Sequence, residues 1–83
     1  MYYIVYNSIT FATGIKNKFR YDHEPITVLH TPAGISVGGC SYSIVVKTAS
    51  KALEVIKASE EYGVKVKGLY KQIDSENFEQ LNY

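Results

Sequence analysis

YYIVYNS, residues 2–8, is the stretch with which the fold begins. Every residue from Tyr2 to Tyr6 is aromatic or β-branched, a composition that favours a buried β-strand. Asn7 and Ser8 then interrupt the strand, and both side chains can accept hydrogen bonds from the free N–H groups of a helix start. We therefore predict a central first strand that leads directly into a helix.

The next segment, residues 9–20, has the apolar spacing of an amphipathic helix. Ile15 follows Ala12 and Phe11 by three and four positions, and Phe19 follows Ile15 by four, which places these apolar residues on one helical face. Later segments predict, in chain order, a strand at 26–30, a strand at 42–46, a helix from Thr48 or Ser50 to Tyr62, and a strand at 64–67 whose lysines are typical of a sheet edge.

This order of elements, βαββαβ, predicts an α+β fold of the ferredoxin-like type. Right-handed crossovers would give an antiparallel sheet with strand order 4-1-3-2 and both helices on one face. We expect residues 1–73 to form a single domain and residues 74–83 to form a tail with a short helix. Phe78 and Leu81 of this tail should cover apolar surface, either on the open sheet face or in a homodimer.

Net charge, apolar runs and the cysteine count together exclude several functional classes for this protein. The chain has 83 residues, nine basic and eight acidic, with a formal net charge of +1, and a nucleic-acid binder usually has a clear basic excess. No apolar run approaches the ~18 residues of a membrane span. Residues 1–7 also lack the features of a secretory signal. A lone cysteine fits a reducing compartment, so we expect a cytoplasmic protein without nucleic-acid or membrane partners.

That cysteine lies in the most informative loop, Gly38-Gly39-Cys40-Ser41. Two glycines let backbone N–H groups approach an anion. In the predicted topology the loop shares one end of the sheet with the start of the first helix, where Ser8 and Thr10 lie. The positive end of the helix dipole would stabilise a thiolate there. The alternative is a small buried side chain in a glycine-rich hairpin loop.

The sequence gives weaker indications of metal binding, RNA binding or enzyme catalysis than of thiol chemistry. His23 and His30 lack the close pairing of a zinc site, so no metal site is predicted. His30 ends the second strand and could help to keep Cys40 as a thiolate. An RNA recognition motif needs a basic, aromatic signature that residues 40–46 lack. No phosphate loop or Ser/His/Asp set is present, which favours an accessory protein over a stand-alone enzyme.

Four stretches also carry a family resemblance: residues 3–10 (YIVYNSIT), Thr31-Pro32 followed by Ile35-Ser36, residues 38–41 (GGCS) and residues 61–70 (EYGVKVKGLY). With these the chain, over residues 2–73, resembles the selenium/sulfur carrier-like family, small bacterial domains of unknown function. Two positions depart from the family pattern, because Ala33 stands where many members have Arg and Ser41 where many have Gly. The missing Arg removes a positive charge that would hold an anion.

The resemblance implies that Cys40 accepts a sulfur or selenium atom and carries it as a persulfide or perselenide. The donor would be a cysteine desulfurase or selenocysteine lyase, the acceptor another protein, and the chain itself would hold no cofactor. Side chains and backbone groups expected to support the thiolate or the carried anion belong to Gly38, Gly39, Ser41, Ser8, Thr10 and Ser36. The rival hypothesis is a non-catalytic binding module that holds a small ligand or a protein on its open sheet face or its loops.

Overall fold

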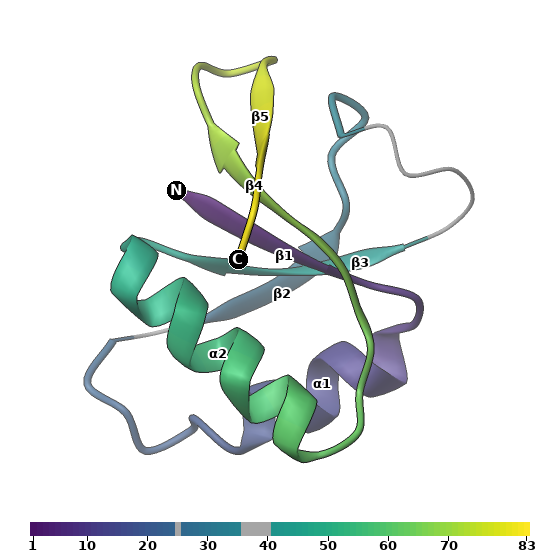
Figure 1. The fold of residues 1–83 in the computed structure, drawn as a ribbon, viewed down its shortest axis with the longest axis vertical. Coiled ribbons are helices and arrows are strands. Elements are labelled where there is room, and N and C mark those ends of the chain that lie inside the picture. The colour runs from purple at the N-terminus through teal and green to yellow at the C-terminus, as the bar shows by residue number, and fades with distance from the viewer. Residues whose placement is uncertain (25, 36–40) are drawn as a thin grey trace.

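The computed structural model describes residues 1–24, 26–35 and 41–83 (Figure 1). Two helices and five strands follow one another in these ranges. They are β1 (Tyr2–Tyr6), α1 (Ile9–Asn17), β2 (Thr27–His30), β3 (Tyr42–Val46), α2 (Ala49–Glu61), β4 (Val66–Gln72) and β5 (Phe78–Leu81).

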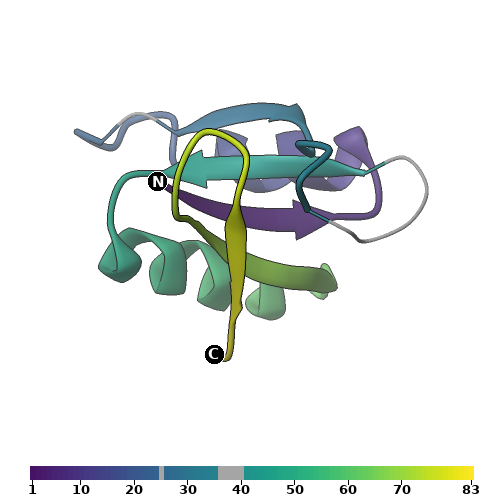
Figure 2. The same cartoon turned by 90° about the horizontal axis from the view of Figure 1, so that it is seen from above.

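The strands form one antiparallel sheet with the order β2-β3-β1-β4-β5. Ile4 in the middle of β1 pairs with Ile44 of β3 and with Leu69 of β4. Both helices lie on one side of the sheet, below it in Figure 1, and the β4–β5 hairpin rises on the other side. Figure 2 shows the same layers from above.

The predicted α+β class is confirmed, but the four-stranded layout is wrong in two respects. A fifth strand extends the sheet, so β4 is not the edge strand along Leu69 to Gln72, where β5 pairs with it. The fourth strand also begins later than predicted, at Val66 rather than residue 64.

The fifth strand replaces the short helix that the tail was expected to form. A turn after β4 reverses the chain, because the Asp74 carboxylate accepts hydrogen bonds from the backbone N–H groups of Glu76 and Asn77 and from the Asn77 amide. These bonds hold the pKa of Asp74 below its ordinary value. The reversed chain then pairs with β4, which sets Phe78 against Gln72 and Leu81 against Leu69. Spacing alone could not reveal this long-range pairing.

The helix boundaries follow the capping residues that the sequence indicated. Ser8 Oγ accepts a hydrogen bond from the Phe11 N–H at 3.2 Å and begins α1. Thr48 Oγ1 accepts from the Lys51 N–H at 3.1 Å and begins α2. Beyond the end of α2, Gly63 has a φ of +71°, the left-handed conformation that glycine adopts without strain.

The alternation of β1 divides the apolar residues between the two faces of the sheet. Ile4 and Tyr6 point toward the helices and join the main core, whose buried members are Ile4, Tyr6, Ala12, Ile15, Ile26, Ile44, Val46, Ala52, Val55, Ile56 and Leu69. Tyr3 and Val5 point the other way. They belong to a second cluster, made of Tyr3, Val5, Ile35, Val45 and Tyr70, against which Leu29 and Phe78 pack.

The second cluster corrects one element of the rival hypothesis, which placed a ligand on an open sheet face. Ile35 comes from residues 31–35, the segment after β2 that we call the arm, and Phe78 comes from β5. Because these side chains pack there, Tyr3, Val5 and Val45 are buried. The middle of this face is therefore closed within the domain and offers no free sheet surface to a ligand.

A hydroxyl group is built into the main core. The Tyr6 hydroxyl lies 2.7 Å from Ser59 Oγ, and Ser59 Oγ donates a hydrogen bond to the Val55 carbonyl at 2.9 Å. Since the Ser59 proton is committed to that carbonyl, Tyr6 donates to Ser59. Burial raises the pKa of Tyr6 to about 12; the bond to Ser59 acts in the opposite direction, and the nearby Tyr83 adds to the rise.

We expect Tyr6 to ionise at a higher pH than an ordinary tyrosine and to couple its ionisation to unfolding. Its folded pKa lies above the ordinary value of 10.0, so its contribution to stability is complete below pH ~10 and is lost as the pH rises through about 12. Alkaline titration followed by tyrosinate absorbance should show a late phase that Tyr6→Phe removes. If Tyr6→Phe instead removes a phase near pH ~10, the raised pKa is wrong.

Candidate functional site

Half of the predicted site lies outside the residues that the structure describes: Ser36, Gly38, Gly39 and Cys40. The structure does place Ser8, Thr10, His30 and Ser41, and Ser41 follows Cys40 directly in the chain.

The start of α1 and Ser41 lie at the same end of the sheet. Tyr6, the last residue of β1, pairs with Tyr42, the first residue of β3. Ser41 precedes that pair, and α1 begins at Ile9, shortly after it, on the right of Figure 1. The chain order predicted this proximity, and it follows physically from the antiparallel pairing of β1 with β3.

The electrostatics of that end favour an anion. The first turn of α1 contains no acidic residue, so none of its own side chains neutralises the positive end of the helix dipole. Ser8 Oγ is used as the cap and satisfies the N–H of Phe11. Thr10 lies in the first turn and is exposed. The Ser8 hydroxyl is therefore committed to the helix cap, whereas Thr10 is exposed to solvent.

Ser41 is firmly held. It is only 4% exposed, and its carbonyl accepts a hydrogen bond from the Thr31 N–H at 3.1 Å. The Thr31 hydroxyl lies 2.8 Å from Ser43 Oγ, which is fully buried between the neighbouring strands. Sequence analysis missed Thr31 and Ser43, although two hydroxyl residues at the facing ends of a predicted hairpin were a signal that could have found them.

His30 lies at the end of β2, next to the hydrogen bond between Thr31 and Ser41. It pairs with Tyr42 across β2 and β3, and the two rings stack with centroids 4.4 Å apart and an interplanar angle of 34°. His30 is exposed. The structure thus brings His30, Ser41 and the start of α1 to one end of the sheet.

The arm, residues 31–35, packs against the face of the sheet opposite the helices. Its Ile35 N–H donates to the Pro32 carbonyl at 3.0 Å, and the Ile35 side chain is buried in the second cluster. Ala33, where the resemblance would have placed an Arg, is exposed. The five residues 36–40 are therefore flanked by two buried residues, Ile35 and Ser41.

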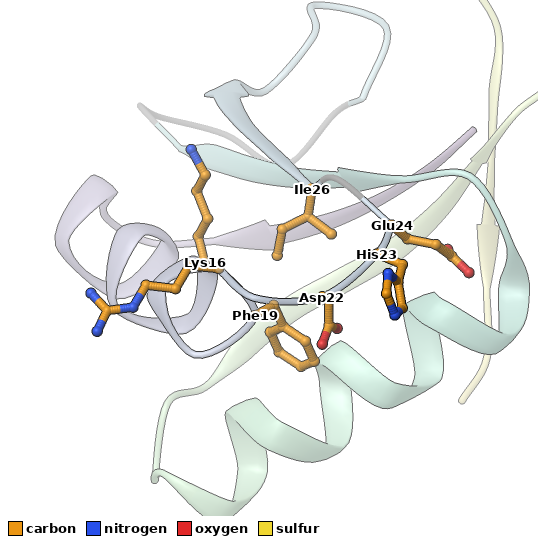
Figure 3. Close-up of a pocket in the computed structure, with 7 residues that line it drawn as sticks. Lys16, Phe19, Asp22, His23, Glu24 and Ile26 are labelled. Carbon is orange, nitrogen blue, oxygen red and sulfur yellow. The ribbon is translucent and has the colours of Figure 1, made fainter.

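A hollow of about 300 Å³ lies elsewhere, next to the end of α1 (Figure 3). Its lining combines basic, acidic and apolar side chains: Lys16, Phe19, Arg20, Asp22, His23, Glu24 and Ile26. Ile26 directly precedes β2, and β2 runs from there to His30, so the hollow lies at the opposite end of the sheet from Ser41. His23 thus belongs to this hollow and not to the cysteine site.

The described ranges, 1–24, 26–35 and 41–83, contain no group of three or more His, Cys, Asp or Glu residues arranged to hold a metal ion. Neither of the helices found in them has the length and apolar character needed to cross a membrane.

Fold and sequence together define a small α+β domain. Its single cysteine directly precedes Ser41, a buried residue at one end of the sheet. A family model described as "Putative Se/S carrier protein-like" matches residues 1–71, and the chain belongs to this family. No curated protein and no solved structure matches the chain. Residues 72–83, which include β5, lie beyond the family match.

Proposed function

We propose that this protein carries a sulfur or selenium atom on Cys40 as a persulfide or perselenide. The observation that supports the proposal most directly is the placement of Ser41. This neighbour of Cys40 is anchored at the end of the sheet where α1 begins, and the first turn of that helix has no acidic residue. Membership in the carrier-like family supports the same assignment.

The transfer needs only thiolate chemistry. The Cys40 thiolate attacks the terminal sulfur of a cysteine persulfide on the donor, a bond forms between the two sulfurs, and the donor cysteine leaves as a thiolate. An acceptor thiolate then attacks the terminal sulfur on Cys40 in the same way and regenerates the Cys40 thiolate. No net oxidation occurs. Because Cys40 is the only cysteine, the carried atom cannot be discharged as an intramolecular disulfide and must pass to a partner.

The proposal implies two partners in a reducing compartment, which we take to be the cytoplasm. The donor is a cysteine desulfurase for sulfur or a selenocysteine lyase for selenium, and the acceptor is a second protein with a reactive thiol. Ser8, Thr10, Ser41 and His30 are the described residues that we assign to the support of the thiolate or of the carried anion. Ser36, Gly38 and Gly39 complete the proposed set.

The direct test is mass spectrometry after incubation with a cysteine desulfurase and cysteine. The wild-type protein should gain the mass of one sulfur atom, located on Cys40 and removed by a reductant, and Cys40→Ser should gain none. A selenocysteine lyase with selenocysteine tests the selenium form. If the wild type stays unmodified in both reactions, or if Cys40→Ser is modified equally, the carrier function is wrong.

A second prediction concerns the thiol. An ordinary cysteine titrates near pH ~8.5, and the helix start should lower the Cys40 pKa below that value. The pH dependence of alkylation by iodoacetamide measures it. Ser8→Ala should move the midpoint upward, because loss of the cap loosens the helix start. Thr48→Ala is the matched control, since Thr48 caps α2 beyond the far end of β3 and should leave the midpoint unchanged.

These outcomes separate the two hypotheses. A native midpoint at or above that of free cysteine would remove the physical basis of the carrier function and favour the binding module. Equal shifts in Ser8→Ala and Thr48→Ala would show a general loss of helix stability in place of a local effect on the thiol.

A further inference from the structure

The hollow at the end of α1 has an apolar floor that belongs to the main core. Ile26 is only 8% exposed and is a buried member of that core, and Phe19 packs against the same core. Backbone hydrogen bonds fix the turns after α1, since the Phe19 N–H donates to the Lys16 carbonyl at 2.9 Å and the Asp22 N–H donates to the Phe19 carbonyl at 3.0 Å. With a volume of about 300 Å³, the hollow reaches the lower end of the size range of small-molecule sites. Its floor can therefore hold the body of a small organic ligand.

Lys16 and Arg20 give the lining of this hollow two cations that lack an acidic partner. Both side chains are exposed, and neither pairs with a carboxylate of a described residue. The Arg20 guanidinium lies 4.9 Å from the centre of the Tyr21 ring. The last carbonyls of α1 already accept hydrogen bonds from the N–H groups of the turn that follows, which weakens the negative end of the helix. The two positive charges are therefore available to a ligand.

The acidic residues of the lining compete little with a bound anion. The Asp22 carboxylate is bound by the Lys51 ammonium from α2, so its charge is balanced within the domain. In Figure 3, Glu24 stands beside His23, on the opposite side of the floor from Lys16. A ligand that lies on the floor can thus place an anionic group next to Lys16 and away from Glu24.

We propose that this hollow binds a small organic carboxylate. The apolar body of the ligand lies on Phe19 and Ile26. Its carboxylate binds the Lys16 ammonium and the Arg20 guanidinium, whose planar arrangement of N–H donors matches the two carboxylate oxygens. The hollow lies at the opposite end of the sheet from Ser41, so this binding is independent of the proposed carriage of sulfur or selenium.

Benzoate, benzamide and benzylamine test the proposal, because they share an aromatic body and differ in charge. Each compound is titrated into the isotope-labelled protein, and the backbone amides are followed by NMR. Benzoate should shift the amides of residues 16–24 and 26 with a Kd on the order of 1 mM, which is ordinary for a ligand of about nine non-hydrogen atoms. Benzamide and benzylamine should bind about tenfold more weakly, since neither can accept the charge-assisted hydrogen bonds of a carboxylate.

Three results of these titrations would overturn the proposal. The first is equal binding of benzamide and benzoate, and the second is tighter binding of benzylamine. The third is the absence of benzoate-induced shifts in these residues at concentrations well above the expected Kd. Inorganic phosphate tests the floor separately, because it carries negative charge without an apolar body. If phosphate binds as tightly as benzoate, the floor plays no part and the proposed ligand class is wrong.

Lys16→Gln and Arg20→Gln remove the two cations one at a time. Both residues are exposed, so we expect both variants to fold, and each should weaken benzoate binding about fivefold to tenfold. Lys57→Gln is the matched control, because Lys57 is exposed on α2 and does not line the hollow, and it should keep the wild-type Kd. A wild-type Kd in both variants of the hollow, or an equal loss in Lys57→Gln, would refute the assignment of the two cations.

Discussion

Replacing Ile44 by Ala should lower the free energy of unfolding by about 3–4 kcal/mol. Ile44 is fully buried in β3, where it pairs with Ile4 of β1 and with Val28 of β2. The change leaves a cavity at the centre of the main core that the surrounding strands cannot close. Domains of this size have a total stability on the order of 4–12 kcal/mol, so the loss is a large share of the whole.

Urea denaturation measures this effect. Leu53→Ala is the matched control, because Leu53 is 53% exposed on α2 and its truncation should change the stability by less than about 0.5 kcal/mol. Ile44→Val should give an intermediate loss of about 1 kcal/mol. Equal stabilities for Ile44→Ala and Leu53→Ala would contradict the packing of β3 between β1 and β2.

Replacing Lys51 by Ala should cost about 2 kcal/mol, an amount typical of a hydrogen bond to a charged group. The Lys51 side chain is only 8% exposed, and its ammonium binds the Asp22 carboxylate. It also lies 3.5 Å from Glu54 Oε1 and 4.8 Å from the centre of the Phe19 ring. This single side chain therefore ties α2 to the segment that follows α1.

The contribution of Lys51 to the free energy of unfolding should fall as the pH rises into the alkaline range. Burial by itself lowers the pKa of Lys51, but the hydrogen bond and charge of Asp22 and the charge of Glu54 outweigh it, so the pKa is raised. The stabilisation is then complete below the unfolded value near pH ~10.4 and is lost as the pH rises through the higher folded value. Urea denaturation of wild type and Lys51→Ala should differ most at neutral pH and converge in strong alkali.

Lys57→Ala serves as the control for this prediction, because Lys57 is exposed on the same helix. It should change the stability by less than about 0.5 kcal/mol at every pH. A Lys51→Ala loss no larger than that of Lys57→Ala would show that the contact with Asp22 contributes nothing.

That Ser41 and the start of α1 lie at one end of the sheet could be inferred from chain order, because it depends on simple geometry. A strand followed at once by a helix, and a hairpin that returns to pair with that strand, bring the helix start and the hairpin loop to one end of the sheet. The observed pairing of Tyr6 with Tyr42 has this consequence. The contacts that hold Ser41 were not predicted, because a hydroxyl pair such as Thr31 and Ser43 is formed only when the register of two strands is set.

The sequence by itself determined the α+β class and the caps at Ser8 and Thr48, because each depends on residues close together in the chain. Only the tertiary structure decided that the tail is a strand and that Phe78 closes the face of the sheet opposite the helices. The spacing of Phe78 and Leu81 suits a helical turn, but pairing with β4 satisfies the backbone of the tail and buries Phe78 against Tyr3. Such long-range contacts outweigh local preference because they bury apolar area that an isolated turn cannot.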